Sequence, residues 1–283
     1  MIVQLLNGLA FGVLLLVLSS GLALIFGLRG VVNFAHGAFY MLAAYLAMTI
    51  SGTVNFWVAL IVTPLLMALL GVLLDRFGLR YLEDRPALDL VLLTFGVALV
   101  IGDIVLSVWG SHPYSINPPP GLQGSLDILG TSYPTYRLFV VVIGLVVGTA
   151  LVLWLRLTRV GLYVRASSTR RVASGVAGVD IDRVSATVVG LGLGLAGLAG
   201  VLAGPYLALT PSMGLDILVL TFIVVIIGGL GSIVGAMIAA LALGMINSFG
   251  SVYIPDVAQY VPYVLMLAVL LVRPLGVAGA RSH

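Results

Sequence analysis

The feature that most constrains the fold is a succession of long apolar runs. Hydrophobic residues make up 61% of the 283-residue chain and charged residues only 8%, against about 25% charged residues in ordinary soluble domains. Several runs reach the roughly 20 residues that a helix needs to cross the hydrocarbon core of a bilayer. Backbone polar groups must be satisfied internally in lipid, so helices are the expected spanning elements. The sequence therefore predicts an all-α fold, a polytopic transmembrane helical bundle that forms one domain over 1–283.

Eight or nine spans are expected, some of them broken. The run at 37–52 is short, and the sequence GGLGS at 228–232 interrupts another run, so half-helices or re-entrant pieces are expected at these two places. The apolar segments lie at about 5–28, 37–52, 54–74, 88–109, 136–155, 184–209, 217–232, 233–250 and 257–272.

An internal repeat is a further expectation. An apolar helix, a break containing glycine and a second apolar helix occur at 21–44 and again at 219–244. Paired interruptions of this kind are typical of transporters built from inverted repeats, in which the freed backbone groups are buried in protein or line a cavity. The alternative is that glycine is simply common in membrane helices.

The charged residues exclude several functions. All 13 cations are arginine, and the chain contains no lysine. Without lysine there is no G-x-x-x-x-G-K-[ST] phosphate loop, so transport powered by ATP would need a separate nucleotide-binding partner. The net charge of +3 is too small to suggest a nucleic-acid partner. The chain has no cysteine, which excludes disulfides and thiolate metal sites.

The arginine positions predict the orientation. The connections at 75–89 and 156–183 carry most of the cations and are expected on the cytoplasmic side. Arg273 and Arg281 place the C-terminus on that side as well. The loop at 110–135 is rich in proline, glycine and serine and contains no cation, so it is expected outside. With nine crossings the N-terminus is outside; with eight it is inside.

The stretch VVNFAHGAFY places polar side chains within an apolar segment. Asn33, His36 and Tyr40 share one helix face and are candidates for lining a translocation path. The structural alternative, which we favour, is that Asn33 caps the following helix and His36 hydrogen-bonds a carbonyl of a neighbouring helix. The second break adds the remaining candidates for the path, Gly229, Gly231 and Ser232.

Other polar residues suggest little chemistry. Asp103 is the one carboxylate expected at membrane depth. It would serve a proton relay, lie near the outer interface, or pair with a neighbouring polar group. A metal site is not expected, because no second ligand has the right spacing from His36. The sequence shows no pair of nucleophile and base, so an enzyme is not expected.

Two patterns concern packing and docking. Gly192, Ala196, Gly200 and Gly204 recur at every fourth position and predict a seam for close helix packing. The 156–183 loop predicts one short amphipathic helix with small residues, suited to a cleft in a soluble partner. The alternative is a basic loop that is solvated or binds lipid headgroups.

Several motifs resemble the LivH type of permease subunit from bacterial branched-chain amino acid ABC importers. These are NFAHG at 33–37, LTRVGLYVRAS at 157–167, GVDIDRV at 178–184 and VVIIGGLGSIVGAMIAALALGMIN at 224–247. They occur in the right order, and the resemblance extends over essentially the whole chain.

The resemblance implies a set of partners in the bacterial inner membrane. A second, LivM-like permease, two ATPase subunits that hold ATP and Mg, and a periplasmic substrate-binding protein would complete the importer. This chain would hold no cofactor of its own. The resemblance also implies a short coupling helix in the 156–183 loop that docks on the ATPase. Its candidate residues are Arg165, Ala166, Ser167, Arg170, Arg171, Ala173, Gly175 and Gly178.

The resemblance does not decide which solute is transported. Branched-chain or other hydrophobic amino acids are the first expectation, and urea, amides or aromatic acids are alternatives that the resemblance also allows. A secondary transporter driven by ions would use Asp103 and Asp216. A passive channel for a small neutral solute would use Asn33 and His36 as its filter.

Overall fold

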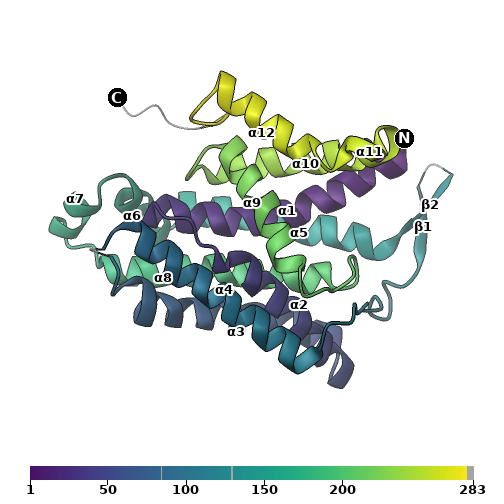
Figure 1. The fold of residues 1–283 in the computed structure, drawn as a ribbon, viewed down its shortest axis with the longest axis horizontal. Coiled ribbons are helices and arrows are strands. Elements are labelled where there is room, and N and C mark those ends of the chain that lie inside the picture. The colour runs from purple at the N-terminus through teal and green to yellow at the C-terminus, as the bar shows by residue number, and fades with distance from the viewer. Residues whose placement is uncertain (84, 129, 279–283) are drawn as a thin grey trace.

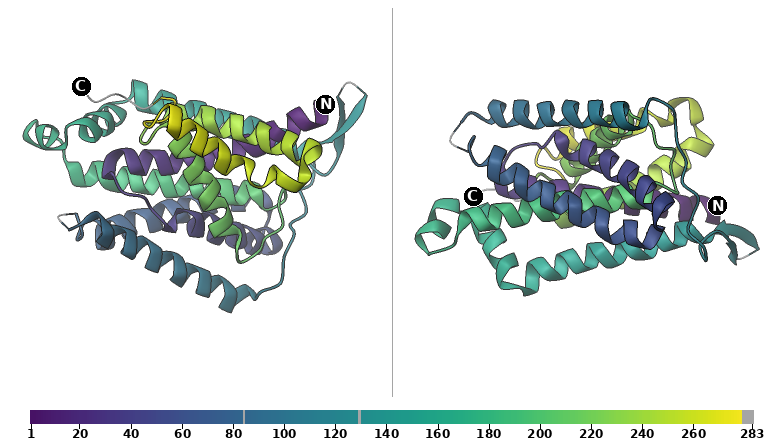
Figure 2. Two further views of the ribbon diagram at one scale, coloured as in Figure 1. Left: turned by 45° about the horizontal axis from the view of Figure 1, so that its top comes forward. Right: turned by 90° about the horizontal axis from the view of Figure 1, so that it is seen from below.

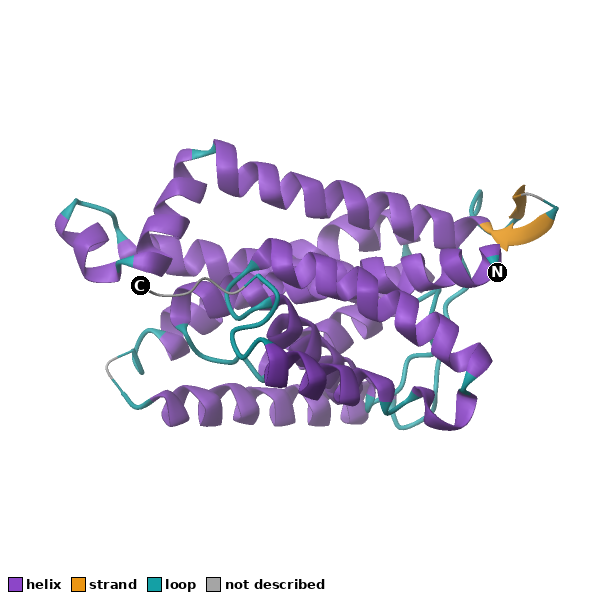
Figure 3. Cartoon of the chain, turned by 90° about the horizontal axis from the view of Figure 1, so that it is seen from above, coloured by secondary structure: helices purple, strands orange, loops and turns teal. Residues whose placement is uncertain are grey.

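The computed structural model describes residues 1–83, 85–128 and 130–278 as a helical bundle with one small pair of strands (Figures 1 and 3). By length and composition, six helices in this part of the chain could cross a membrane. They are α1 (Ile2–Arg29), α3 (Phe56–Leu74) with its π-helical extension η1 (Asp75–Leu79), α4 (Ala87–Trp109), α5 (Thr135–Leu157), α8 (Ile181–Ala203) and α10 (Ile233–Tyr253). The remaining elements are α2 (Ala35–Thr53), β1 (Ser125–Ile128), β2 (Thr131–Pro134), α6 (Arg159–Thr169), α7 (Arg171–Val176), α9 (Met213–Gly228), α11 (Pro255–Ala258) and α12 (Val261–Val272).

The bundle has two distinct ends. The short helices α6 and α7 lie at one end, which we call the α7 end. The N-terminus, α11 and the antiparallel hairpin of β1 and β2 lie at the other, the hairpin end (Figures 1 and 2). The hairpin belongs to the predicted outer loop, so the all-α prediction missed only this small element.

Helix α1 forms the centre of the core. It packs against α5, α8, α9 and α10, and its middle residues are buried on every side. Close approach to α10 depends on small residues, because a side chain at Gly8 or Gly12 would meet the backbone of Met245 or Leu241. A helix that is apolar all round and buried in this way is typical of the interior of a membrane bundle.

Helix α2 begins beside the middle of α1 rather than beside its end. The Nε2 atom of His36, in the first turn of α2, hydrogen-bonds the carbonyl oxygen of Leu18 at 2.9 Å. From Leu18, α1 continues to Arg29, a rise of about 16 Å. The chain then returns through 30–34 to mid-depth, and α2 runs to the hairpin end, where Trp109 donates a hydrogen bond to Thr49 at 2.9 Å. Helix α2 thus starts inside the bundle, in agreement with the broken span expected at 37–52, and helices that start there are called half-helices below.

Helix α9 begins at the same depth and runs the other way. A side chain at Gly214 would meet the carbonyl oxygen of Gly37, and one at Gly37 would meet that of Gly214. At its far end, α9 leads into the break at 229–232, where Gly231 lies against Gly27 near the end of α1. The starts of α2 and α9 thus meet inside the bundle, and the two helices point to opposite ends.

These contacts indicate an inverted repeat that relates α1–α4 to α8–α12. Helix α10 packs on α1 as α3 packs on α8, α9 contacts α10 as α2 contacts α3, and α9 contacts α12 as α2 contacts α4. Inversion pairs the segment 30–34 with 204–212, each of which links a long helix to a half-helix.

The sequence comparison of 21–44 with 219–244 paired the wrong segments. Gly27 and Gly231 are in contact, so the breaks after α1 and α9 lie at the same end of the bundle. Inverted counterparts would lie at opposite ends. The true counterpart at 204–212 contains two prolines instead of a glycine cluster, which hid it from a search for glycine breaks.

Candidate functional site

The central crossing is built from glycines on four helices. Helices α1 and α8 touch at Gly21 and Gly192, where a side chain on either residue would collide with the carbonyl group of the other. Helices α2 and α9 touch in the same way at Gly37 and Gly214. Gly192 belongs to the predicted packing seam of α8. The rest of that seam faces α2 at Gly200, whose side chain would meet the carbonyl of Tyr40, and the outer loop at Gly204. Ala196, between them, is fully buried.

The predicted polar path residues near α2 are buried at this crossing. The Oδ1 atom of Asn33 accepts a hydrogen bond from the backbone N–H of Ala35 at 3.1 Å, which closes a turn before the first helical residue. His36 bonds to Leu18 as described above. The His36 bond is the one that the structural alternative predicts. The N-cap of α2 is Phe34 and has no side-chain capping bond, so Asn33 supports the start of the helix from one residue before the cap. Tyr40 is 2% exposed and also packs inside.

A cavity of about 330 Å³ lies beside the crossing, between α2, α4 and α9, and we call it the central cavity. Most of its wall is apolar, with Phe34 and Phe95 among the larger side chains. Its one ionisable residue is Asp103, an exposed carboxylate on α4. The full lining is Phe34, Ala38, Met41, Phe95, Ala98, Leu99, Gly102, Asp103, Leu106, Pro211, Gly214 and Leu215.

Asp103 lies within a predicted span. It precedes Trp109, the last residue of α4, by a rise of about 9 Å. A carboxylate facing lipid at that depth would be costly, and such residues normally face water or protein. This side of α4 is therefore expected to adjoin an aqueous space or a partner chain.

A buried ion cluster ties helices together at the α7 end. Arg29 at the end of α1 pairs with Asp75 of η1 and with Glu83 at 3.1 Å. The side chain of Asp75 is fully buried and also accepts a hydrogen bond from Ser185 of α8 at 2.8 Å. Arg80 pairs with Asp182, at the start of α8, at 3.1 Å. The cluster therefore joins α1, η1 and the beginning of α8.

The 156–183 loop forms two helices, where the sequence predicted one. Arg170, between α6 and α7, leaves the helical conformation with φ −142° and ψ 76°, and Gly178 adopts a positive φ of 86° after α7. Arg165, Ala166 and Ser167 of the predicted coupling set lie on α6. Arg171, Ala173 and Gly175 lie on α7, and the side chain of Arg171 falls outside the described part of the structure.

The two short helices differ in exposure. Helix α6 packs Gly161, Val164 and Ser167 against the bundle. Helix α7 lies farther out, at the tip of the α7 end (Figure 1), and its Val172 and Val176 are 83% and 87% exposed. Two apolar side chains this exposed on a short helix at the end of the bundle are typical of a surface that a partner covers.

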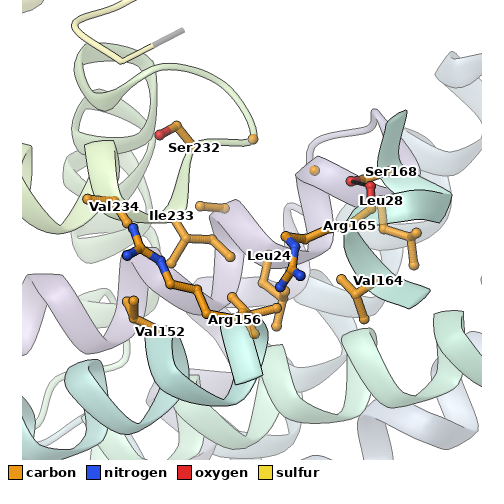
Figure 4. A pocket seen from close by; sticks show the side chains of 14 residues that line it. Leu24, Leu28, Val152, Arg156, Val164, Arg165, Ser168, Ser232, Ile233 and Val234 are labelled. Atoms are coloured by element: carbon orange, nitrogen blue, oxygen red, sulfur yellow. Dashed lines mark hydrogen bonds between the residues drawn. The ribbon is translucent and has the colours of Figure 1, made fainter. Parts of the chain in front are cut away.

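A second cavity, of about 220 Å³, brings the coupling loop to the break between α9 and α10 (Figure 4). Arg156 of α5 and Arg165 of α6 extend along it, and Gly231 and Ser232 form another part of its wall. Neither guanidinium forms an ion pair with a residue that the structure describes. Predicted coupling and path residues thus meet here, beside two cations that can hold an anionic group.

Sequence reasoning missed the ion cluster and most of the central cavity. The sequence gives no signal that Arg29 and Asp75 pair, because the two residues lie far apart along the chain. The cavity wall draws on three helices and on apolar residues such as Phe34 and Leu99, which resemble any lipid-facing residue. Asp103 was the one signal that could have found it.

Apolar helices around two opposed half-helices define a polytopic membrane protein of the transporter class. The family model described as the branched-chain amino acid transport system permease component matches residues 4–270. The chain belongs to this family.

Individual relatives agree with the family match. The chain is 27% identical to the high-affinity branched-chain amino acid transport system permease protein LivH of Salmonella typhimurium, over 98% of this chain and 94% of the relative. It is also 27% identical to the permease protein BraD of Pseudomonas aeruginosa, over 98% and 95%. A probable branched-chain amino acid transport permease protein LivH of Methanocaldococcus jannaschii is 28% identical over 94% and 89%. No solved structure gives a significant match.

Proposed function

We propose that this chain is the membrane-spanning permease subunit of an ATP-driven importer for branched-chain or other hydrophobic amino acids. The observation that carries the proposal is the family match over 4–270, together with relatives whose names state branched-chain amino acid transport. The chain contains no lysine for a phosphate loop, so two partner ATPase subunits would hold ATP and Mg. A second, LivM-like permease and a periplasmic binding protein would complete the assembly in the bacterial inner membrane.

In this proposal the α7 end faces the cytoplasm, with the C-terminus, and α7 is the element that docks on the ATPase. Its exposed Val172 and Val176 would enter an apolar cleft there. Helix α8 follows directly, and its first turn is tied through Asp182 and Ser185 to Arg80 and Asp75. A displacement of α7 on closure of the ATPase pair would therefore reach α8, η1 and α1 together.

Alternating access would then be a rearrangement of the two inverted halves around the central crossing. In the present conformation Asn33, His36 and Tyr40 are buried between helices, and Gly231 and Ser232 face the cavity of Figure 4. Gly229, directly after α9, packs against the backbone at Gly276. That these residues contact cargo in another state of the cycle stays a prediction.

The first experiment is affinity purification of the chain from its native membrane, followed by identification of the proteins that accompany it. Two ATPases with phosphate loops and a second permease support the proposal. A chain that purifies alone and transports amino acids without ATP contradicts it and favours an ion-coupled carrier, with Asp103 as the first residue to test.

A further inference from the structure

We infer that the central cavity is a binding site for an amino acid with an apolar side chain, and that Asp103 binds its ammonium group. The inference rests on the proposed function for its cargo class and adds a location and a set of contacts. Two observations carry it, the volume and lining of the cavity and the single carboxylate on its wall. The two helix starts at its inner side indicate the orientation of the ligand.

The cavity matches the apolar part of such a ligand. Its volume of about 330 Å³ is at the lower end of the range for small-molecule sites. Phe34, Met41, Phe95 and Leu99 contribute rings and flexible aliphatic groups to the wall. Such a wall suits a branched or aromatic side chain and has few groups for a polar one.

The charges match the polar part. An amino acid carries one cation and one anion, and Asp103 is the one ionisable residue in the lining. No described residue forms an ion pair with it, so its charge is available for a ligand ammonium. A carboxylate exposed within a span needs such a partner more than one at the surface does.

The carboxylate group of the bound amino acid would point away from Asp103, toward the inner side of the cavity. The starts of α2 and α9 meet at Gly37 and Gly214, and Gly214 and Phe34 line the cavity. The positive ends of both helix dipoles therefore lie on its inner side, where they favour a carboxylate. Opposed half-helices around a site near mid-depth are the arrangement by which other transporters bind anionic groups of their substrates. The cavity and Asp103 carry the inference, and the dipoles orient the ligand.

The absence of cysteine makes the test specific. Ala98→Cys introduces the only thiol of the chain, on the cavity wall, and Leu126→Cys introduces one on the exposed hairpin, outside the candidate spans. In native membranes we would measure the rate of alkylation of each thiol by a small water-soluble maleimide, with and without L-leucine. Leucine should slow the reaction at Ala98→Cys at least threefold and leave Leu126→Cys unchanged.

Asp103→Asn, combined with Ala98→Cys, removes the charge at nearly constant shape. Protection by leucine should then disappear, while Asp127→Asn in the hairpin should preserve it. The analogue 4-methylpentanoate, which has the side chain and the carboxylate but no ammonium, should protect Ala98→Cys poorly when Asp103 is intact. An unreactive thiol at position 98, no protection, or protection that survives Asp103→Asn would overturn the inference.

The assay separates this inference from the proposed function. Protection is a property of the chain in its membrane and requires no ATP. If the chain transports leucine with ATP but shows no protection, the site is wrong and the function stands. If leucine protects but no ATPase accompanies the chain, the site stands and the importer assignment fails.

Discussion

Single glycines at the central crossing determine how closely the half-helices approach. At Gly37, the position that a side chain would take is occupied by the carbonyl group of Gly214, and the reverse holds at Gly214. A larger residue at either position would separate α2 from α9 and move the wall of the central cavity. The two glycines of α4 differ, because neither Gly96 nor Gly102 has anything within 4 Å of the position that a side chain would occupy.

Gly37→Val should therefore destabilise the protein, whereas Gly96→Val should have little effect. Overpacking of a tight contact costs about 1–3 kcal/mol or more, which corresponds to a decrease in Tm of roughly 3–10 °C for a chain of this size. Thermal unfolding in detergent measures the difference. Equal Tm values for the two variants would show that the crossing is not a rigid contact.

Asp75 provides a second test at the residue scale. Its side chain is fully buried beside Arg29, which is 5% exposed. Asp75→Asn leaves the Arg29 charge without its principal partner and should reduce stability by about 3–5 kcal/mol. Asp182→Asn disrupts the exposed pair with Arg80 and should cost less than about 1 kcal/mol. Unfolding midpoints in detergent would contradict this account if the second variant were the less stable.

At the scale of elements, α6 and α7 have different surroundings. Helix α6 buries one face against the bundle, whereas α7 exposes its apolar residues at the tip. The 156–183 loop was predicted as one helix because its small and apolar residues keep a helical spacing. The non-helical backbone at Arg170 interrupts this helix, and no residue type there signals the break.

Val172→Glu should abolish docking of the ATPase without unfolding the permease, because a charge would enter an apolar interface. The matched control is Leu126→Glu, which alters an exposed apolar residue of the hairpin at the opposite end. Co-purification of the ATPase with each variant is the measurement. Retention by Val172→Glu at the wild-type level would mean that α7 is not the docking element.

The sequence predicted long helices better than broken ones. The segment 88–109 corresponds to Ala87–Trp109, and 136–155 to Thr135–Leu157, because hydrophobic length alone defines a span. The segment 184–209 was predicted too long, since α8 ends at Ala203. The apolar residues beyond it are buried for another reason: Leu209 pairs with Tyr114 of the outer loop.

On the scale of the whole molecule, the α7 end and the hairpin end lie at opposite ends of the bundle, and in the proposed importer they face opposite sides of the membrane. Orientation follows from the arginines of the 75–89 and 156–183 connections. Single cysteines introduced at Val172 and at Leu126 should therefore differ in their accessibility to reagents outside intact cells. A membrane-impermeant thiol reagent should label Leu126→Cys and spare Val172→Cys until the cells are lysed. Labelling of Val172→Cys in intact cells would reverse the proposed orientation.

The inverted repeat gives the molecule two halves that meet at mid-depth. Helix α5 lies between them in the sequence and has no counterpart in the second half. Such an arrangement allows a central site to face either side through a change in how the halves pack. In the proposed importer the ATPase would supply the energy for that change.

The most direct measurement is uptake of radiolabelled leucine by proteoliposomes that contain the complex purified with this chain. The binding protein would be supplied outside and ATP trapped inside. We expect uptake that requires ATP and the binding protein, persists when ionophores collapse the proton and sodium gradients, and is lost with Val172→Glu. Uptake that needs no ATP and stops with the ionophores would contradict the account and identify an ion-coupled carrier.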